Sequence, residues 1–306
     1  MIAYVVRRLG FSLFVLWGAL TIVFAAVRMA PGDPAALMLG SDATEADLAA
    51  LRARLGLDRP FVVQYTTYLA QTVTLDFGMS LRLDQPASQA IAERLGETGR
   101  LAASAMVLAL ITSFPLGILA ALRPRSWIDA LVSVVSLLGQ SVPSFWLGIM
   151  FILLFARNLR LLPSGGSETW QHLLLPAVTL ALPLIGVLTR LVRSGMLDVL
   201  GEDYIRTARA KGLTGAAVLA RHALINMLIP VITVIGLQLG HLLGGAVITE
   251  NVFAWPGVGR LLVDAISNRD YPLVQAAVLY ITAGFVLINF LVDLSYGYLD
   301  PRVRLG

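Results

Sequence analysis

The sequence contains no cysteine and a single lysine, Lys211. Without cysteine the chain cannot form disulfides, thiolate metal sites or cysteine nucleophiles. An ATP-hydrolysing P-loop needs a lysine in the pattern G-x-x-x-x-G-K-[ST], and the lone lysine follows Ala210 instead. Only three scattered histidines occur, with neither H-E-x-x-H nor G-x-S-x-G. We therefore expect no catalytic residue, no metal and no cofactor bound by this chain.

Charged residues are scarce as well, at 14% of the chain, against about 25% in ordinary soluble domains. Hydrophobic residues make up 57%, and the mean hydropathy is +0.78. A helix that crosses a bilayer needs about 20 mostly apolar residues. Six segments meet this requirement: Leu9 to Val27, Leu101 to Leu122, Ala130 to Ala156, His172 to Thr189, Leu228 to Ile248, and Ala276 to Tyr298. The composition predicts an all-α polytopic membrane protein with six transmembrane helices.

The basic residues predict the orientation of these spans. Six spans place both termini on one side, and that side then carries twelve arginine and lysine residues, from Arg7 to Arg304. The two short loops on the other side carry only Arg157, Arg160, Arg260 and Arg269. Because cytoplasmic loops are enriched in such residues, we expect both termini in the cytoplasm. The first span, residues 1–30 with its cytoplasmic end, is longer than a signal-peptide core and stays as an anchor.

The residues between the first two spans, 31–100, form a long outer segment with helical patterns. Thr44 to Leu55 has helical spacing, and Thr44 is a candidate cap before an acidic first turn. Phe61 to Leu75 is apolar and aromatic, and Gln89 to Leu95 is another short helix candidate. We expect a small, mostly helical periplasmic subdomain, followed by a five-helix permease core over residues 101–306.

A second informative segment, residues 196–227, lies on the cytoplasmic side between spans four and five. From Gly201 to Gly212 it has acidic residues at its start and basic residues at its end, which suits a helix dipole. Glu202 and Arg206 are spaced for an i,i+4 ion pair. Glycines 212 and 215 then interrupt the pattern before a second helical run, Ala216 to Asn226. The pattern predicts a short helix–turn–helix, and a solvated connecting loop is the alternative.

The same residues carry a resemblance to a known family. The run Asp203-Tyr204-Ile205-Arg206-Thr207-Ala208-Arg209-Ala210-Lys211-Gly212 resembles the "EAA" loop of permeases in binding-protein-dependent ABC importers, in the version of the dipeptide/oligopeptide branch. Arg206 and Thr207 stand where the general pattern has Glu and the first Ala. Further matches follow in order over about 300 residues, and they include Pro31-Gly32-Asp33-Pro34, Leu55 to Asp58, Asp76-Phe77-Gly78, Leu243 to Val247, Glu250, Trp255-Pro256-Gly257, Asp270-Tyr271-Pro272 and Asp300 to Arg304.

The resemblance implies an inner-membrane subunit of a bacterial importer for peptides or peptide-like solutes. It implies three kinds of partner: a second, related permease in a heterodimer, two ATP-binding subunits that carry ATP and Mg²⁺, and a periplasmic or lipid-anchored solute-binding protein. No nucleic acid is implied. In the family the EAA loop is the coupling helix that docks on the ATPase. The residues that would contact or shape this coupling surface are Asp203, Tyr204, Arg206, Thr207, Ala208, Lys211 and Gly212.

Polar residues and glycines inside the spans are the other candidates. Polar groups at membrane depth face the interior or a water-filled path, and interhelical hydrogen bonding is the alternative. The translocation-path candidates are Gln140, Ser141, Pro143, Gln238 and His241. Gly236, Gly240 and Gly244 share one face of span five and would allow close helix packing, either at the seam with the second permease or within the chain.

Acids inside the spans are rare, which bears on the rival functions. Asp293 is expected to pair with a neighbouring span or with Arg302, and His172 to lie at the membrane boundary. An ion-driven secondary transporter is the main alternative function, and the shortage of intramembrane charge argues against it. An intramembrane protease lacks its motifs.

Overall fold

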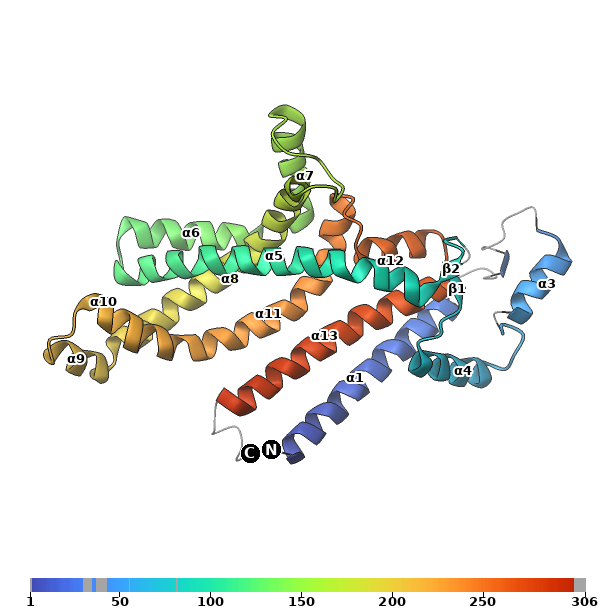
Figure 1. Ribbon diagram of the computed structural model, residues 1–306, viewed down its shortest axis with the longest axis horizontal. Helices are drawn as coiled ribbons and strands as arrows, with labels where there is room; N and C mark the ends of the chain where they lie inside the picture. The colour runs from blue at the N-terminus through green and yellow to red at the C-terminus, as the bar shows by residue number, and fades with distance from the viewer. Residues whose placement is uncertain (1, 30–34, 37–42, 55, 81, 300–306) are drawn as a thin grey trace.

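The computed structural model describes residues 2–29, 35–36, 43–54, 56–80 and 82–299, and this part of the chain is almost entirely helical (Figure 1). The first predicted motif, Pro31 to Pro34, and the chain end from Asp300 lie outside the described residues. The longer elements are α1 (Ile2–Met29), α5 (Ala87–Leu122), α6 (Trp127–Ser141), α8 (Trp170–Gly201), α11 (Leu224–Val252) and α13 (Tyr271–Leu299). The shorter ones are α3 (Glu45–Arg54), α4 (Phe61–Thr74), α7 (Ser144–Phe151), the π-helical η1 (Ile152–Asn158), α9 (Asp203–Ala210), α10 (Gly215–Val218), η2 (Leu219–Ala223) and α12 (Val258–Ser267).

Five helices among the described residues are long and apolar enough to span a membrane: α1, α5, α8, α11 and α13. Five of the six predicted spans lie within these helices, one in each. The helices extend beyond the apolar windows, and α5 is the largest case because its 36 residues also include the predicted short helix at Gln89 to Leu95. That short helix is therefore the first part of α5 and not a separate element.

The third predicted span, Ala130 to Ala156, is not one helix. The α6 helix and the α7–η1 helix meet at an angle of 100°, so the pair is one broken span or a re-entrant loop. Pro143 causes the break, because proline has no N–H for the helix and disfavours helical geometry at the residue before it. Val142 accordingly has extended backbone angles, with φ −86° and ψ 126°. Pro143 is the residue before α7. The Pro143 carbonyl accepts a hydrogen bond from the Leu147 N–H, and this bond closes the first turn of α7.

The helices pack so that two ends of the molecule can be distinguished. Helix α8 packs on α5, α6 and α11, while α13 packs on α11 and α1. Figure 1 shows α9 and α10 at one end, which we call the α9 end. At the opposite end, the α12 end, lie α12, α4 and an antiparallel hairpin of β1 (Met79–Ser80) and β2 (Gln85–Pro86). This hairpin was not predicted from the sequence.

The short helices after α1 are held against its end by aromatic and polar contacts. The Phe24 side chain of α1 is buried, and its ring centroid lies 5.3 Å from the rings of Phe61, Tyr65 and Tyr68 on α4. Thr44 caps α3 as expected: its hydroxyl accepts the Asp47 N–H at 3.2 Å, and hydrogen bonds from Thr44 hold the pKa of the Asp47 carboxyl below its usual value.

Ion pairs join helices in two further places. Arg8 of α1 pairs with Asp293 of α13 at 3.0 Å, so Asp293 has the partner on a neighbouring span that the sequence predicts. Asp129 of α6 is buried and accepts hydrogen bonds from the Arg193 guanidinium of α8 at 2.5 and 2.8 Å. Both pairs tie helices that also pack against each other.

Candidate functional site

The helix α9 forms the first candidate site, because it has one buried face and one exposed face. Ile205 and Ala208 are buried in an apolar cluster with Met196 of α8, Val218 of α10 and Met227 of α11. Tyr204, Arg206, Thr207 and Arg209 lie on the outside of the molecule. Burial of the apolar face fixes α9 to the ends of α8 and α11. Its polar face is left available at the α9 end.

Gly212 ends this unit with a backbone conformation that other residues rarely adopt. Its φ is +82°, and its N–H donates to the Arg209 carbonyl at 2.9 Å. The Leu213 N–H donates to the Ala208 carbonyl at 3.3 Å, so the last turn of α9 is closed. Positive φ favours glycine because a side chain would clash with the backbone. A Cβ built on Gly212 meets no atom within 4 Å, so the space beyond it is open.

The other predicted coupling residues divide into exposed and buried ones. The exposed ones are Asp203, Tyr204, Arg206, Thr207, Lys211 and Gly212. Ala208 is 6% exposed and faces the chain's own core, so it supports the helix and does not offer a contact surface. The expected Glu202–Arg206 ion pair is not the one observed. Glu202 precedes the first turn of α9 with extended backbone angles, and Arg206 pairs with Asp203 at 3.3 Å.

Four of the five translocation-path candidates lie on α6 and α11, and three of them, Gln140, Ser141 and His241, have a side-chain contact with a carbonyl of their own helix. The Gln140 amide donates to the Ser136 carbonyl at 3.1 Å, and the Ser141 hydroxyl donates to the Leu137 carbonyl at 2.8 Å. His241 is exposed, and its Nδ1 lies 3.1 Å from the Leu237 carbonyl oxygen. Gln140 also lies against α8, where a Cβ on Gly186 would be 2.9 Å from its Cγ. Pro143 forms the α6–α7 bend, and Gln238 is half-buried on α11.

The three glycines of α11 differ in what they face. A Cβ on Gly236 would overlap Val292 of α13, and a Cβ on Gly240 would lie 3.0 Å from the Phe285 ring of the same helix. These two glycines therefore allow α11 and α13 to pack within the chain. At Gly244 no atom lies within 4 Å of the Cβ position. Gly236 and Gly240 thus pack inside the chain, while Gly244 lies on an open surface of α11.

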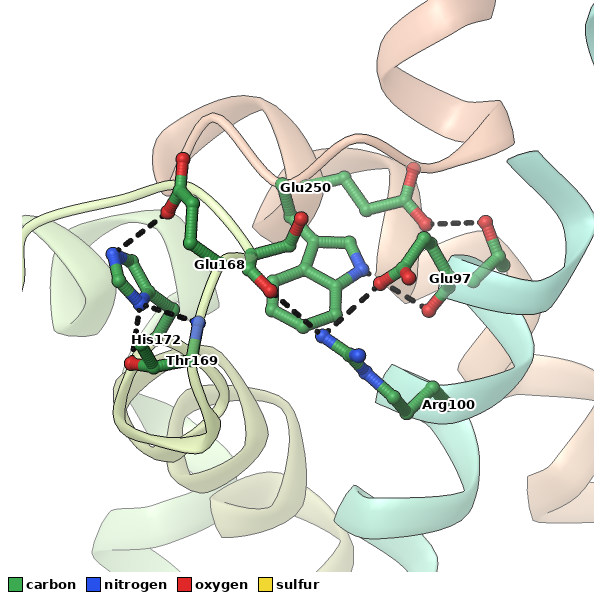
Figure 2. Close-up of polar contacts among 9 residues, drawn as sticks. Glu97, Arg100, Glu168, Thr169, His172 and Glu250 are labelled. Atoms are coloured by element: carbon green, nitrogen blue, oxygen red, sulfur yellow. Dashed lines mark hydrogen bonds and ion pairs between the residues drawn. The ribbon is translucent and has the colours of Figure 1, made fainter. Parts of the chain in front are cut away.

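A second candidate site, at the α12 end, is built around the buried carboxylate of Glu250 (Figure 2). One carboxylate oxygen accepts the Thr98 hydroxyl at 2.7 Å, and the other accepts the Arg260 N–H at 3.0 Å. The Thr98 hydroxyl in turn accepts the Val258 N–H at 2.9 Å. Within the described part of the chain no cationic side chain pairs with this carboxylate. The carboxyl group lies at the first turn of α12, where backbone N–H groups have no acceptor within the helix.

Glycines on α12 make this close approach possible. Gly257 precedes α12, and a Cβ there would overlap the Glu250 carboxylate. A Cβ on Gly259 would lie 2.9 Å from a Glu250 oxygen and would also press on the Val247 backbone. Glu250 therefore joins α5, α11 and α12 through one carboxylate, and the flanking glycines leave the space that it occupies.

Trp255 and Arg100 extend this junction to the segment before α8, and Figure 2 shows Arg100 beside Glu97. Trp255 is fully buried, and its indole N–H donates to the Glu97 carbonyl at 3.0 Å. The Arg100 guanidinium lies 4.7 Å from the Trp255 ring centroid, pairs with the Glu97 carboxylate at 3.2 Å and donates to the Ser167 carbonyl at 3.3 Å.

The expected boundary residue, His172, lies beside this junction. His172 and Thr169 together cap α8, and the Thr169 hydroxyl lies 2.9 Å from the His172 Nδ1. The Nε2 atom of His172 lies 2.9 Å from the Glu168 carboxylate. Segments 97–100, 167–172 and 250–260 therefore meet at one place.

Comparisons with known proteins place the whole chain in one group. Residues 113–305 match the family described as "Binding-protein-dependent transport system inner membrane component", and residues 1–102 match its N-terminal counterpart. The chain is 41% identical to the dipeptide transport system permease protein of Alkalihalophilus pseudofirmus, over 99% of this chain and all of the relative. It is 42% identical to the glutathione transport system permease protein of Escherichia coli (strain K12), over 99% of both chains.

A solved structure shares the fold. A chain of the MetNI methionine ABC transporter in inward-facing conformations matches with a TM-score of 0.55 at 20% identity. The match covers 69% of this chain and 97% of the other. The matched part of this chain therefore has a fold that is also found in an ABC transporter.

Proposed function

Since the chain belongs to the family of inner-membrane components of binding-protein-dependent transport systems, we propose that it forms half of the translocation pathway of an importer for peptides or peptide-like solutes. Members of this family are non-catalytic permease subunits of ABC importers, so ATP hydrolysis belongs to partner ATPases. The relatives named for dipeptide and glutathione transport support short peptides as the substrate class. A heterodimer with a second permease, above two ATP-binding subunits, would complete the pathway.

The observation that carries this proposal is the two-faced α9 helix. Its apolar face is buried against α8 and α11, while its polar face carries Tyr204, Arg206 and Lys211 outward. A short helix with an exposed face is suited to a groove on a partner protein. Because α9 is fixed to the ends of two long helices, a displacement by the ATPase would be passed to the spans. We therefore assign ATPase coupling to this surface.

The Glu250 junction supports an outer gate at the other end. It ties α12 to α5 and α11 through hydrogen bonds to a single buried carboxylate. Bonds of this kind have two discrete states, made or broken, and thus suit a junction that opens when the helices move apart. The polar and bent segment around Gln140, Ser141 and Pro143, with Gln238 and His241 on α11, would line the path between the two ends.

Purification and reconstitution test this function directly. The tagged chain, expressed with its neighbouring genes, should co-elute with ATPase subunits and a second permease. In proteoliposomes, uptake of a labelled dipeptide should require ATP, Mg²⁺ and the solute-binding protein together. Uptake that follows an ion gradient and ignores ATP would instead identify an ion-driven secondary transporter.

The orientation of the chain has its own test. We expect the α9 end in the cytoplasm together with both termini, and residues 31–100 with α12 in the periplasm, because the basic residues favour this arrangement. Reporter fusions after Ser88 and Asn268 should therefore give periplasmic signals. Fusions after Arg125 and Gly215, and at Gly306 beyond the described residues, should give cytoplasmic ones. A cytoplasmic signal at Ser88 would overturn the orientation.

A further inference from the structure

A polar cavity of about 330 Å³ opens at the α12 end, beside the Glu250 junction but separate from it. The walls of the cavity come from the turn of the β1–β2 hairpin, from the N-terminal part of α5, from α12 and from the start of α13. The polar residues that line it are Arg82, Arg94, Arg260, Asp264, Asn268 and Asp270. No lining residue comes from α6, α8 or α11. A soluble molecule can therefore reach the cavity without entering the bundle of spans.

The cavity has more positive charge than its acids neutralise. The Asp270 carboxylate is buried, accepting the Ser80 hydroxyl at 2.5 Å and the Leu273 N–H at 3.3 Å. Asp264 is exposed, and its carboxylate lies 3.9 Å from the Arg260 guanidinium. These two acids face three guanidinium groups.

The guanidinium groups of Arg82 and Arg94 retain most of their hydrogen-bonding capacity. Arg82 donates to the side-chain oxygen of Asn268. Glu93, the acid next to Arg94 in the chain, accepts a hydrogen bond from Gln89 at 3.1 Å. In the part of the chain that the structure describes, neither Arg82 nor Arg94 forms an ion pair with an acid. Each guanidinium has five N–H donors arranged to grip a carboxylate in a bidentate manner.

We propose that this cavity is a carboxylate-binding site that seats acidic side chains of the solute-binding protein. This proposal rests on the proposed function, since it needs a binding protein that delivers solute to the α12 end. The exposed rim residues Arg82, Asp264 and Asn268 favour a protein partner over a free peptide, because the site lies on the flank of the outer end and not between the spans.

Arg260 connects the cavity to the Glu250 junction. Its side chain lines the cavity and donates to the Ala254 carbonyl, while its backbone N–H is bound to Glu250. A carboxylate drawn into the cavity would therefore pull on the same first turn of α12 that holds the Glu250 junction. Docking and the state of that junction are thereby linked through one residue.

The double variant Arg82→Gln/Arg94→Gln tests the site without touching Arg260. Affinity of the substrate-loaded solute-binding protein for the complex in nanodiscs is measured at low and high NaCl. We expect about tenfold weaker binding at low salt and a flatter salt dependence, because charge pairs at an interface are screened by ions. Arg157→Gln is the matched control: it removes an exposed arginine at the end of η1 that does not line the cavity, and it should change affinity less than about twofold.

Two outcomes would overturn the proposal. Unchanged affinity, salt dependence and dipeptide uptake in the double variant would show that the cavity binds no carboxylate. Unchanged docking with weaker uptake of a dipeptide, but not of its C-terminal amide, would assign the cavity to the substrate carboxylate and overturn the protein partner. Co-elution of the ATPase subunits and unaltered basal ATP hydrolysis check that the variant is assembled. Stimulation of the wild-type complex by its binding protein tests the proposed function independently of this cavity.

Discussion

Gly212→Val is expected to abolish import while the chain still inserts and accumulates normally. The φ of +82° at this position costs a residue with a Cβ about 1–2 kcal/mol, and valine, being β-branched, is among the least tolerant. The strain falls on the turn after α9 and leaves the spans untouched. Uptake of dipeptide and stimulation of ATP hydrolysis by loaded binding protein should each fall more than about tenfold, since a misplaced α9 cannot dock.

Two control variants separate the turn from the contact surface. Gly212→Asn adds a side chain in the same open space, but asparagine tolerates positive φ, so the turn should persist. Gly215→Ala adds a Cβ at a helical glycine where no atom lies within 4 Å, and it should be neutral. If Gly212→Asn transports near the wild-type rate while Gly212→Val does not, the turn geometry is what matters. If Gly212→Asn also loses transport, the docking surface requires that no side chain is present at position 212. Normal stimulation in Gly212→Val would end the coupling assignment at this residue.

Glu250→Ala should clearly destabilise the folded chain. It leaves the buried Thr98 hydroxyl and the part-buried Arg260 N–H without their acceptor, and the loss of a buried hydrogen bond costs about 1–3 kcal/mol. Removal of a fully buried side chain adds a cavity cost. Thermal unfolding in detergent should occur at a clearly lower temperature, and transport should fall with it.

A graded pair of variants tests the two acceptor oxygens of Glu250. Glu250→Gln keeps the shape and one acceptor oxygen but replaces the other by an NH2 donor, so its stability should fall between that of wild type and that of Glu250→Ala. Glu168→Ala removes a carboxylate at the same end whose side chain is 75% exposed, and its unfolding temperature should match wild type. Equal stability of Glu250→Ala and wild type would contradict the structural role of this carboxylate.

The sequence predicted the elements whose signals are local. Five spans were recognisable because apolar runs of membrane length need no knowledge of their neighbours, and α9 was recognisable from its terminal charges and the glycine that follows. For the third span only the expectation of one continuous helix was wrong, because hydropathy is averaged over a window and does not register a single residue that breaks the helix. The proline at 143 with its flanking serines was the available sign of the bend.

The Glu250 junction could not be predicted in the same way. Thr98 and Glu250 are 152 residues apart, and their hydrogen bond depends on how α5, α11 and α12 pack. Glycines at 257 and 259 beside a lone acid at the end of a span were a partial sign, since they indicate a close backbone approach. The ion pair of Arg8 with Asp293 was partly predictable, because an acid inside a span needs a partner.

The unbroken length of α5 makes it a lever between the two ends. Within this helix, the stretch from Thr98, beside Glu250, to Ala121, in the cluster that buries Ile205 of α9, extends roughly 35 Å at about 1.5 Å per residue. A Cβ on Gly117 would lie 2.8 Å from the Thr189 carbonyl oxygen, so the α5 and α8 backbones lie in close contact. A rotation of this stretch by about 5° about one end would displace the other end by about 3 Å, which is enough to break a hydrogen bond at the junction.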